Sequence, residues 1–271
     1  MTSKLGILAG SGPLPGYLIE ACRADGREVF VVAFENHADP AVIAGAPHAW
    51  VRLGAAGAAL KLLRRHGVAD VVLAGPVGRP GLAELRPDSR ALKYLSKGLL
   101  NQGDDGVLRA IIGILELEEG FRVIGADDVL ASAVMPAGVL GAHAPDAAAE
   151  ADIRRGLAVL GALGMHDIGQ AVVVQQGVVL GIEAVEGTDG LLARCAGLRR
   201  DGAGGVLVKL AKANQDRRAD MPAAGPLTVA SAARAGLRGV ALGAGACLLL
   251  DRAAAVVAAD AAGLFLVGVE P

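Results

Sequence analysis

Short apolar blocks alternate with amphipathic segments throughout the first half of the chain. Blocks of strand length occupy residues 4–9, 27–34, 70–75 and 121–126. Segments whose apolar positions follow a helical period lie between these blocks, at residues 17–25, 55–66 and 104–119. Strand and helix signals that alternate at this spacing predict a parallel sheet with helices on its faces.

The second half shows a less regular pattern, which predicts a mixed α/β domain. Residues 171–187 contain two strand-like runs that turn near Gln176 and Gly177, as in a hairpin. Further apolar runs occupy residues 205–211, 239–250 and 264–269, and helical segments occupy residues 146–165, 228–236 and 252–260. Pro, Gly and Ala dominate residues 136–145. We therefore place a linker there, between domains at residues 1–135 and 146–271.

The composition suits a packed core and excludes several classes of protein. Of the 271 residues, 53% are hydrophobic but only 3% are aromatic, so the core must consist mainly of Ala, Val, Leu and Ile. The net charge is -2 and no basic stripe is visible, so we expect no nucleic-acid partner. Cys22, Cys195 and Cys247 are widely spaced, which favours free buried thiols over a disulfide or a zinc site.

The hydropathy pattern shows neither a signal peptide nor a membrane span. The N-terminal residues enter a strand-like run at once, without the charged and apolar regions of a signal peptide. The nearest candidate for a span, residues 237–262, is interrupted by Arg238, Asp251, Arg252 and Asp260. A span needs about 20 mostly apolar residues. We therefore expect a soluble protein that at most lies on a membrane surface.

The first candidate binding motif is LAGSGPLP at residues 8–15, which follows a strand and opens a helix. Small residues let backbone N–H groups approach a phosphate or sugar, and a helix N-terminus favours anions. The dinucleotide fingerprint GxGxxG is incomplete here, so a tight turn without a ligand is the alternative. The candidate contacts are Gly10, Ser11, Gly12, Pro13 and Leu14.

The motif HDIGQ at residues 166–170 precedes the predicted hairpin. A catalytic triad is poorly supported because no Ser or Cys nucleophile lies near His166 and Asp167 in the sequence, and Asp167 can instead cap a turn. Gln170 stands at a strand entry, where its amide is suited to a uracil or a sugar hydroxyl.

A carboxylate cluster follows the predicted hairpin. Glu183 lies in an apolar strand, and Glu186, Thr188 and Asp189 lie at the following turn and helix start. Carboxylate and hydroxyl oxygens suit a hard divalent cation such as Mg²⁺. Thr188 as an N-cap and Asp189 as a partner of the helix dipole are the alternative reading. Capping does not explain Glu183, because a carboxylate in a buried strand is costly unless it is paired.

A second charged cluster lies at residues 209–222, KLAKANQDRRADMP. Met221 precedes Pro222, which disfavours a helix, so we expect a loop with one turn. In such a loop Lys212, Arg217 and Arg218 are suited to clamping a diphosphate. A carboxylate of the loop, Asp216 or Asp220, is suited to orienting water or ligating a metal. A solvated loop is the alternative.

The ordered segments LAGSGPLP, GDDGVLRA, DIGQAVVV, GIEAVEGTDGLLAR and KANQDRRADMPAAGP resemble the LpxI-type UDP-2,3-diacylglucosamine diphosphatases of lipid A biosynthesis. The resemblance runs from Leu5 to about Val269. The EGTD and QDxRxDxP segments are its most specific parts. Residues 212–214 read KAN where the family tends to have Lys-Pro, and we expect this difference to change loop stiffness rather than chemistry.

The resemblance implies an α/β fold with a Rossmann-like N-terminal domain that has a parallel sheet, and a mixed α/β C-terminal domain that carries the main catalytic motifs. It implies Mg²⁺-dependent hydrolysis of the diphosphate of UDP-2,3-diacylglucosamine to UMP and 2,3-diacylglucosamine 1-phosphate (lipid X). It also implies a homodimer in the cytoplasm, peripheral to the inner membrane and in transient contact with it. A nucleotide-sugar oxidoreductase and a non-catalytic lipid-binding module are the alternatives.

The resemblance and the chemistry of the clusters together assign roles to individual residues. We expect catalytic roles for Asp220, Lys212 and Asp189. The expected ligands of Mg²⁺ are Asp220, Asp189 and Glu186. The expected substrate contacts are the turn at residues 10–14 and Gln170, Thr188, Gln215, Arg217 and Arg218. Asp216 has no role that we separate from a salt bridge to a neighbouring arginine.

Overall fold

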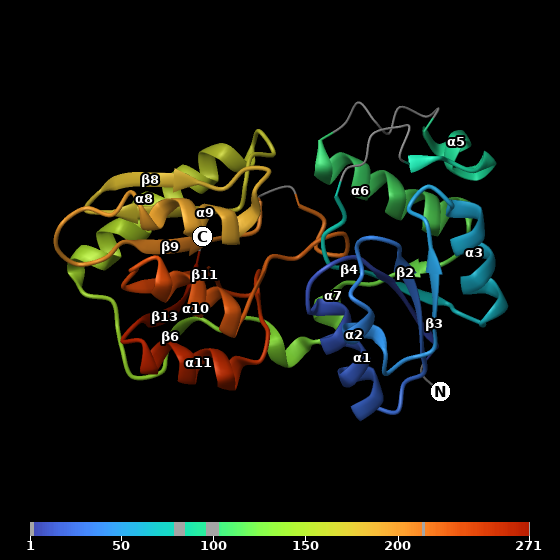
Figure 1. Ribbon diagram of the computed structural model, residues 1–271, viewed down its shortest axis with the longest axis horizontal. Coiled ribbons are helices and arrows are strands. Elements are labelled where there is room, and N and C mark those ends of the chain that lie inside the picture. The colour runs from blue at the N-terminus through green and yellow to red at the C-terminus, as the bar shows by residue number, and fades with distance from the viewer. Residues whose placement is uncertain (1–2, 79–84, 96–102, 213–214, 271) are drawn as a thin grey trace. The chain divides into compact units, whose positions relative to one another are not determined.

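A computed structural model describes residues 3–78, 85–95, 103–212 and 215–270 (Figure 1). The chain divides into two compact units. The first contains residues 1–131 together with the short segment 216–220, and the second contains residues 132–215 and 221–271. Each unit has its own sheet and its own hydrophobic core.

The first unit is built on a parallel sheet of five strands in the order β3-β2-β1-β4-β5, as the sequence predicts. The strands are β1 (Leu5–Ala9), β2 (Val29–Phe34), β3 (His48–Val51), β4 (Asp70–Ala74) and β5 (Arg122–Val123). The helices are α1 (Leu14–Ala24), α2 (Pro40–Ile43), α3 (Ala56–Arg65), α5 (Ser89–Leu95), α6 (Asp104–Gly113) and α7 (Ala126–Val129). Every residue of β1 is buried, as expected for the central strand of a sheet covered on both faces.

Two elements of the first unit differ from the sequence prediction. Strand β5 has two residues, shorter than the predicted run at 121–126, because α7 begins at Ala126. The predicted helix at 104–119 changes from α to π geometry after Gly113, in the segment η2 (Ile114–Glu118). A π segment inside a helix shifts the direction of the side chains that follow, and such segments are often found at functional sites.

The second unit has a mixed sheet of six strands in the order β6-β13-β11-β9-β7-β8. The strands are β6 (Gly138–Leu140), β7 (Ala171–Gln175), β8 (Val178–Ile182), β9 (Val206–Lys209), β11 (Gly239–Gly243) and β13 (Phe265–Val269). Strands β9, β11 and β13 are parallel, whereas β6, β7 and β8 join by antiparallel pairings. Residues 136–145, the predicted linker, lie in this unit and contribute β6.

Helices cover both faces of the second sheet (Figure 1). They are α8 (Ala147–Gly164), α9 (Gly187–Ala196), α10 (Pro226–Arg234) and α11 (Arg252–Ala261). The unit begins at Ser132, within a 3-10 turn, η3 (Ala131–Ala133). Val172 and Val208 face α8, whereas Val173 and Leu207 face the core lined by α9, α10 and α11. This alternation is the period of two expected for β-strands. A separate parallel pair joins β10 (Ala223–Ala224) to β12 (Leu248–Leu249).

A local prediction is confirmed in the second unit. Strands β7 and β8 form the predicted hairpin, and Gln176 and Gly177 form its turn with φ of 54° and 74°. Asp146 caps α8 by accepting a hydrogen bond from the backbone N–H of Ala149. The three cysteines of the chain are free and buried. Among the described residues, no helix is both long and apolar enough to cross a bilayer.

Candidate active site

The turn between β1 and α1 lies at the carboxyl end of the first sheet, where ligands bind in open α/β folds. Gly10 lies so close to the next loop that a Cβ there would be 2.5 Å from the carbonyl oxygens of Gly75 and Pro76. The hydroxyl of Ser11 donates to the carbonyl of Pro76 at 2.9 Å. Helix α1 follows with Pro13 at its N-cap position and no side-chain cap. The predicted strand, turn and helix are therefore present, and no side chain caps the N-terminus of α1. Pro13 and Pro15 have no N–H group, and the N–H of Gly16 donates to the carbonyl of Pro13.

The short segment 216–220 forms the predicted loop with one turn. The carboxylate of Asp216 accepts hydrogen bonds from the backbone N–H of Arg218 at 3.0 Å and from its Nη2 at 2.8 Å. The backbone carbonyl of Asp216 accepts from the N–H groups of Ala219 and Asp220. Hydrogen bonding from Arg218 holds the pKa of Asp216 below its usual value. Asp216 therefore shapes the turn, and the pair with an arginine is its structural role.

The loop is anchored in the first unit at three places. The Nη1 of Arg218 donates to both oxygens of Glu116 on η2, at 3.0 and 3.2 Å. The Nη2 of Arg217 donates to Asp127 of α7 at 2.9 Å. The side chain of Ala219 is buried in the hydrophobic core of this unit. These anchors leave Asp220 at the end of the loop, on an exposed position.

The carboxylate of Glu183 in the second unit is hydrogen-bonded, which explains how a charged group can lie in this buried position. It directly follows β8 and is 5% exposed. Its Oε1 accepts from the hydroxyl of Thr188 at 2.9 Å, and its Oε2 accepts from the backbone N–H of Gln170 at 3.1 Å. The Thr188 hydroxyl in turn accepts from Nζ of Lys209 at 2.9 Å. The alternative of Thr188 as an N-cap is wrong, because Glu186 holds that position and the hydroxyl binds Glu183.

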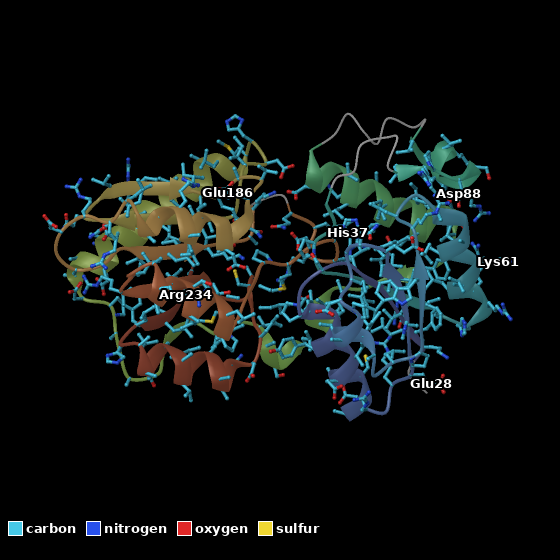
Figure 2. All side chains as sticks on the ribbon, in the orientation of Figure 1. Glu28, His37, Lys61, Asp88, Glu186 and Arg234 are labelled. Carbon is cyan, nitrogen blue, oxygen red and sulfur yellow. The ribbon has the colours of Figure 1, made fainter. Side chains whose placement is uncertain are left out.

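The two carboxylates at the start of α9 have different surroundings. Glu186, labelled in Figure 2, accepts a hydrogen bond from Nη2 of Arg194 at 2.6 Å. This bond holds the pKa of Glu186 below its usual value. Asp189 lies exposed in the first turn of α9. No hydrogen bond to its carboxylate is found among the residues that the structure describes. Asp189 is therefore the more accessible of the two carboxylates.

The other predicted contacts of the second unit lie near the ends of β7 and β9. Lys212 forms an ion pair with Asp167, and its backbone N–H donates to Oε1 of Gln215 at 3.0 Å. The Oε1 of Gln170 is buried and has no hydrogen-bond partner in the described part of the chain. An unpaired buried acceptor is costly, so this oxygen calls for a donor from water or a ligand. Ala213 and Asn214, where the sequence departs from the LpxI pattern, lie outside the described residues.

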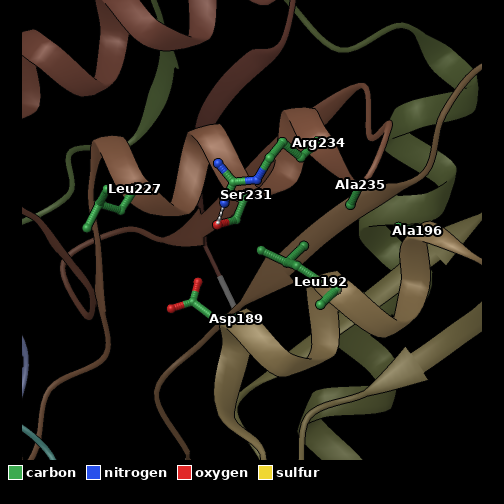
Figure 3. A pocket seen from close by; sticks show the side chains of 8 residues that line it. Asp189, Leu192, Ala196, Leu227, Ser231, Arg234 and Ala235 are labelled. Atoms are coloured by element: carbon green, nitrogen blue, oxygen red, sulfur yellow. Dashed lines mark hydrogen bonds between the residues drawn. The ribbon is translucent and has the colours of Figure 1, made fainter.

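A pocket of about 410 Å³ lies between α9 and α10, with Asp189 in its wall (Figure 3). Its walls are mostly apolar, and Ser231 and Arg234 bind each other at 2.9 Å on one side. The other lining residues are Leu192, Ala193, Ala196, Leu227 and Ala235. Sequence reasoning missed this pocket. On both helices its residues recur at the helical period, a signal that is equally typical of an ordinary packed face.

The carboxylates that the structure describes do not form a complete metal-binding cluster. Within the described ranges, no three His, Cys, Asp or Glu side chains gather closely enough to hold one. Mg²⁺ is usually bound by one or two carboxylates together with substrate phosphates and water, not by a complete protein cage. Asp189 and Asp220 are both exposed, and Glu186 is paired with Arg194.

Comparisons with known proteins cover almost the whole chain. The family model of the LpxI N-terminal domain matches residues 4–133, and that of the LpxI C-terminal domain matches residues 136–267. A curated relative from Caulobacter vibrioides, UDP-2,3-diacylglucosamine pyrophosphatase LpxI, is 42% identical over 99% of this chain and 98% of its own length. The chain therefore belongs to the LpxI family.

Proposed function

We propose that the protein hydrolyses the diphosphate of UDP-2,3-diacylglucosamine to UMP and lipid X, in lipid A biosynthesis. The likeness to the Caulobacter enzyme over the full chain is the observation that carries this proposal. The loop at residues 216–220 supports it, because its carboxylate and guanidinium groups are held in a defined turn and not dispersed in solvent.

The reaction makes two demands on the protein. Attack by water on a diphosphate needs neutralisation of the phosphate charge, and it needs a water molecule aligned with the leaving group. We assign the second task to Asp220, either by accepting a proton from the water or by helping to hold Mg²⁺. When bound, Mg²⁺ would withdraw charge from the diphosphate oxygens. We assign Asp189 as a second ligand of Mg²⁺. Glu186 would bind the metal only after its ion pair with Arg194 is broken.

The basic residues divide into anchors and phosphate contacts. Arg218 is held by two carboxylates, Asp216 and Glu116, so we assign it to holding the loop. The side chain of Arg217 is 52% exposed and, among the described residues, its carboxylate partner is Asp127, so we assign it to a phosphate oxygen. Lys212 would join it after exchanging Asp167 for phosphate. This division keeps two of the three predicted cations for the substrate.

The polar parts of the substrate would be bound at the turn of residues 10–14 and at Gln170. The uncapped N-terminus of α1 suits an anionic or sugar group. The unpaired Oε1 of Gln170 suits the N–H of a uracil. We further propose that the protein works as a homodimer, as the resemblance implies. We also propose that it meets the cytoplasmic face of the inner membrane transiently, because the substrate carries two acyl chains.

An assay of UMP release from UDP-2,3-diacylglucosamine tests the proposed function. We expect release with Mg²⁺ present and loss of most turnover after excess chelator, with recovery when Mg²⁺ is restored. Full activity in chelator would remove the metal from the mechanism. Lipid X binding without UMP release under any metal would favour a lipid-binding module, and a thermal shift with NAD(P) would favour an oxidoreductase.

Replacing Arg218 with lysine tests its assignment as an anchor. Lysine keeps the charge but lacks the planar guanidinium group, whose two terminal nitrogens bind Glu116 and Asp216 at the same time. We expect kcat to fall about tenfold with an unchanged KM, a change of about 1.4 kcal/mol in the barrier. Arg217→Lys is the matched control, and there we expect KM to rise instead. A raised KM in Arg218→Lys would make Arg218 a phosphate contact.

A further inference from the structure

Three polar side chains form a connected chain inside the second unit. Lys209 and Glu183 are 6% and 5% exposed, and the hydroxyl of Thr188 lies between them. The two distances, Lys209 Nζ to Thr188 Oγ1 and Thr188 Oγ1 to Glu183 Oε1, are both 2.9 Å. Neither charged group is within the predicted set of catalytic or substrate-binding residues, so the proposed reaction leaves them unused.

The direction of these hydrogen bonds is fixed by the groups themselves. An ammonium only donates and a carboxylate only accepts, so the single proton of the Thr188 hydroxyl must point to Glu183. Only Thr or Ser can both accept from Lys209 and donate to Glu183 in the same space. A buried pair of charges is seldom retained for stability, because well-packed apolar residues of similar volume are often as good. This favours a role in fixing geometry over a role in stability.

The network joins four segments of the second unit that carry or adjoin candidate site residues. Nζ of Lys209 also donates to the carbonyl of Ala223 at 2.9 Å, at the point where the chain re-enters the unit after Asp220. Glu183 holds the backbone of Gln170. Thr188 precedes Asp189 in the first turn of α9. Lys209 itself is the last residue of β9.

We propose that Lys209 is a positioning residue, which acts through Thr188 to fix the first turn of α9 and thus the carboxylate of Asp189. Through Ala223 it also fixes the chain that follows Asp220. The inference rests on the proposed function, since the carboxylate that it positions is one we assign to the reaction. Lys209 is too deeply buried to touch the substrate, and its effect reaches the chemistry only through the backbone that it holds.

Thr188→Val is the first test, because it removes the hydroxyl and keeps the shape of the side chain. We expect kcat to fall about 100-fold, the cost of a small misplacement of a catalytic group, with KM within threefold of the wild type. Thr188→Ser restores the hydroxyl and should restore kcat. Thr228→Val is the matched control: Thr228 is also half-buried in the first turn of a helix of this unit, where it caps α10.

Three outcomes would overturn the proposal. They are a folded Thr188→Val with nearly normal kcat, a raised KM with kcat retained, and a Thr188→Ser as impaired as Thr188→Val. If Thr188→Val fails to fold, the double variant Lys209→Met with Glu183→Gln takes its place, because it leaves no buried charge unpaired. We expect it to fold and to show the same loss of kcat, and a normal kcat in the folded double variant would also refute the inference.

Amide hydrogen exchange separates this inference from the proposed function. In Thr188→Val we expect faster exchange at residues 187–190 than in the wild type, and no such change in Thr228→Val. This readout needs no substrate. A wild-type protein that releases no UMP would refute the function, whereas unchanged exchange at residues 187–190 would refute the positioning role.

Discussion

Replacement of Asp220 by asparagine is expected to reduce the kcat for UMP release by about 10³-fold, within the range for loss of a general base or metal-binding carboxylate. Asparagine has nearly the size of aspartate, so the turn at residues 216–220 should form as before. The side chain is exposed at the end of that turn, and the substitution leaves the anchors at Glu116 and Asp127 unchanged. Steady-state assays with saturating Mg²⁺ measure the effect.

The control for this substitution is Asp201→Asn, which changes an exposed carboxylate in the loop between α9 and β9. It should leave both kcat and thermal stability within error of the wild type. A folded Asp220→Asn protein that keeps near-full turnover would remove Asp220 from the reaction. The segment QDRRADMP would then be only an anchored surface loop.

Replacement of Asp70 by asparagine is expected to give the largest loss of stability among the charged residues of the first unit. Asp70 opens β4, is 2% exposed, and accepts hydrogen bonds from Ser3, Arg27 and Arg122. Arg27 would lose its carboxylate while its side chain is only 15% exposed. Because Arg122 is largely exposed, we expect the low end of the cost of breaking a buried pair, about 3 kcal/mol.

The same carboxylate makes stability depend on pH. Burial alone would raise the pKa of Asp70, but hydrogen bonds from Arg122 and Ser3 and the charges of both arginines hold it below its usual value. A carboxyl group whose pKa is lower in the folded state than in the unfolded state, where it is about 3.9, stabilises the fold at pH values above the unfolded pKa. This stabilisation is lost as the pH falls through the folded-state pKa. Asp70→Asn should therefore lose stability at pH 7 and show a weaker decline in strong acid.

Urea unfolding at pH 7 and at pH 3 measures both effects. Glu28→Gln is the matched control, since Glu28 pairs with Lys4 at the same end of the strands as Asp70, but its side chain is 77% exposed. A surface pair of this kind is worth about 0–1 kcal/mol. Equal effects of the two substitutions would show that the buried position of Asp70 adds nothing.

The regular parts of the fold are predictable from the sequence because they depend on local patterns. Buried parallel strands such as β1 are continuous apolar runs, and the hairpin at Gln176 and Gly177 follows from a turn signal between two such runs. The loop at residues 216–220 is predictable for a similar reason, since Pro222 excludes a helix there.

The pairings that organise the candidate site are not local, and the sequence alone does not reveal them. Glu116 and Arg218 lie far apart in the chain, and no periodic pattern connects them. A carboxylate at Glu183, in an apolar stretch, is a visible anomaly in the sequence, but its hydrogen bond from Thr188 and the contact of Thr188 with Lys209 depend on the tertiary fold. The change to π geometry at η2 also has no signal in a helical apolar period.

The excursion of residues 216–220 has a consequence for how the protein can be divided or recombined. The chain passes between the units after Ala131, after Gln215 and after Asp220, so no single cut separates them. A fragment that starts at residue 136 would carry Arg217, Arg218 and Ala219 without Asp127, Glu116 and the core that receive them. Chimaeras of related enzymes that exchange their N-terminal halves must therefore exchange residues 216–220 together with that half.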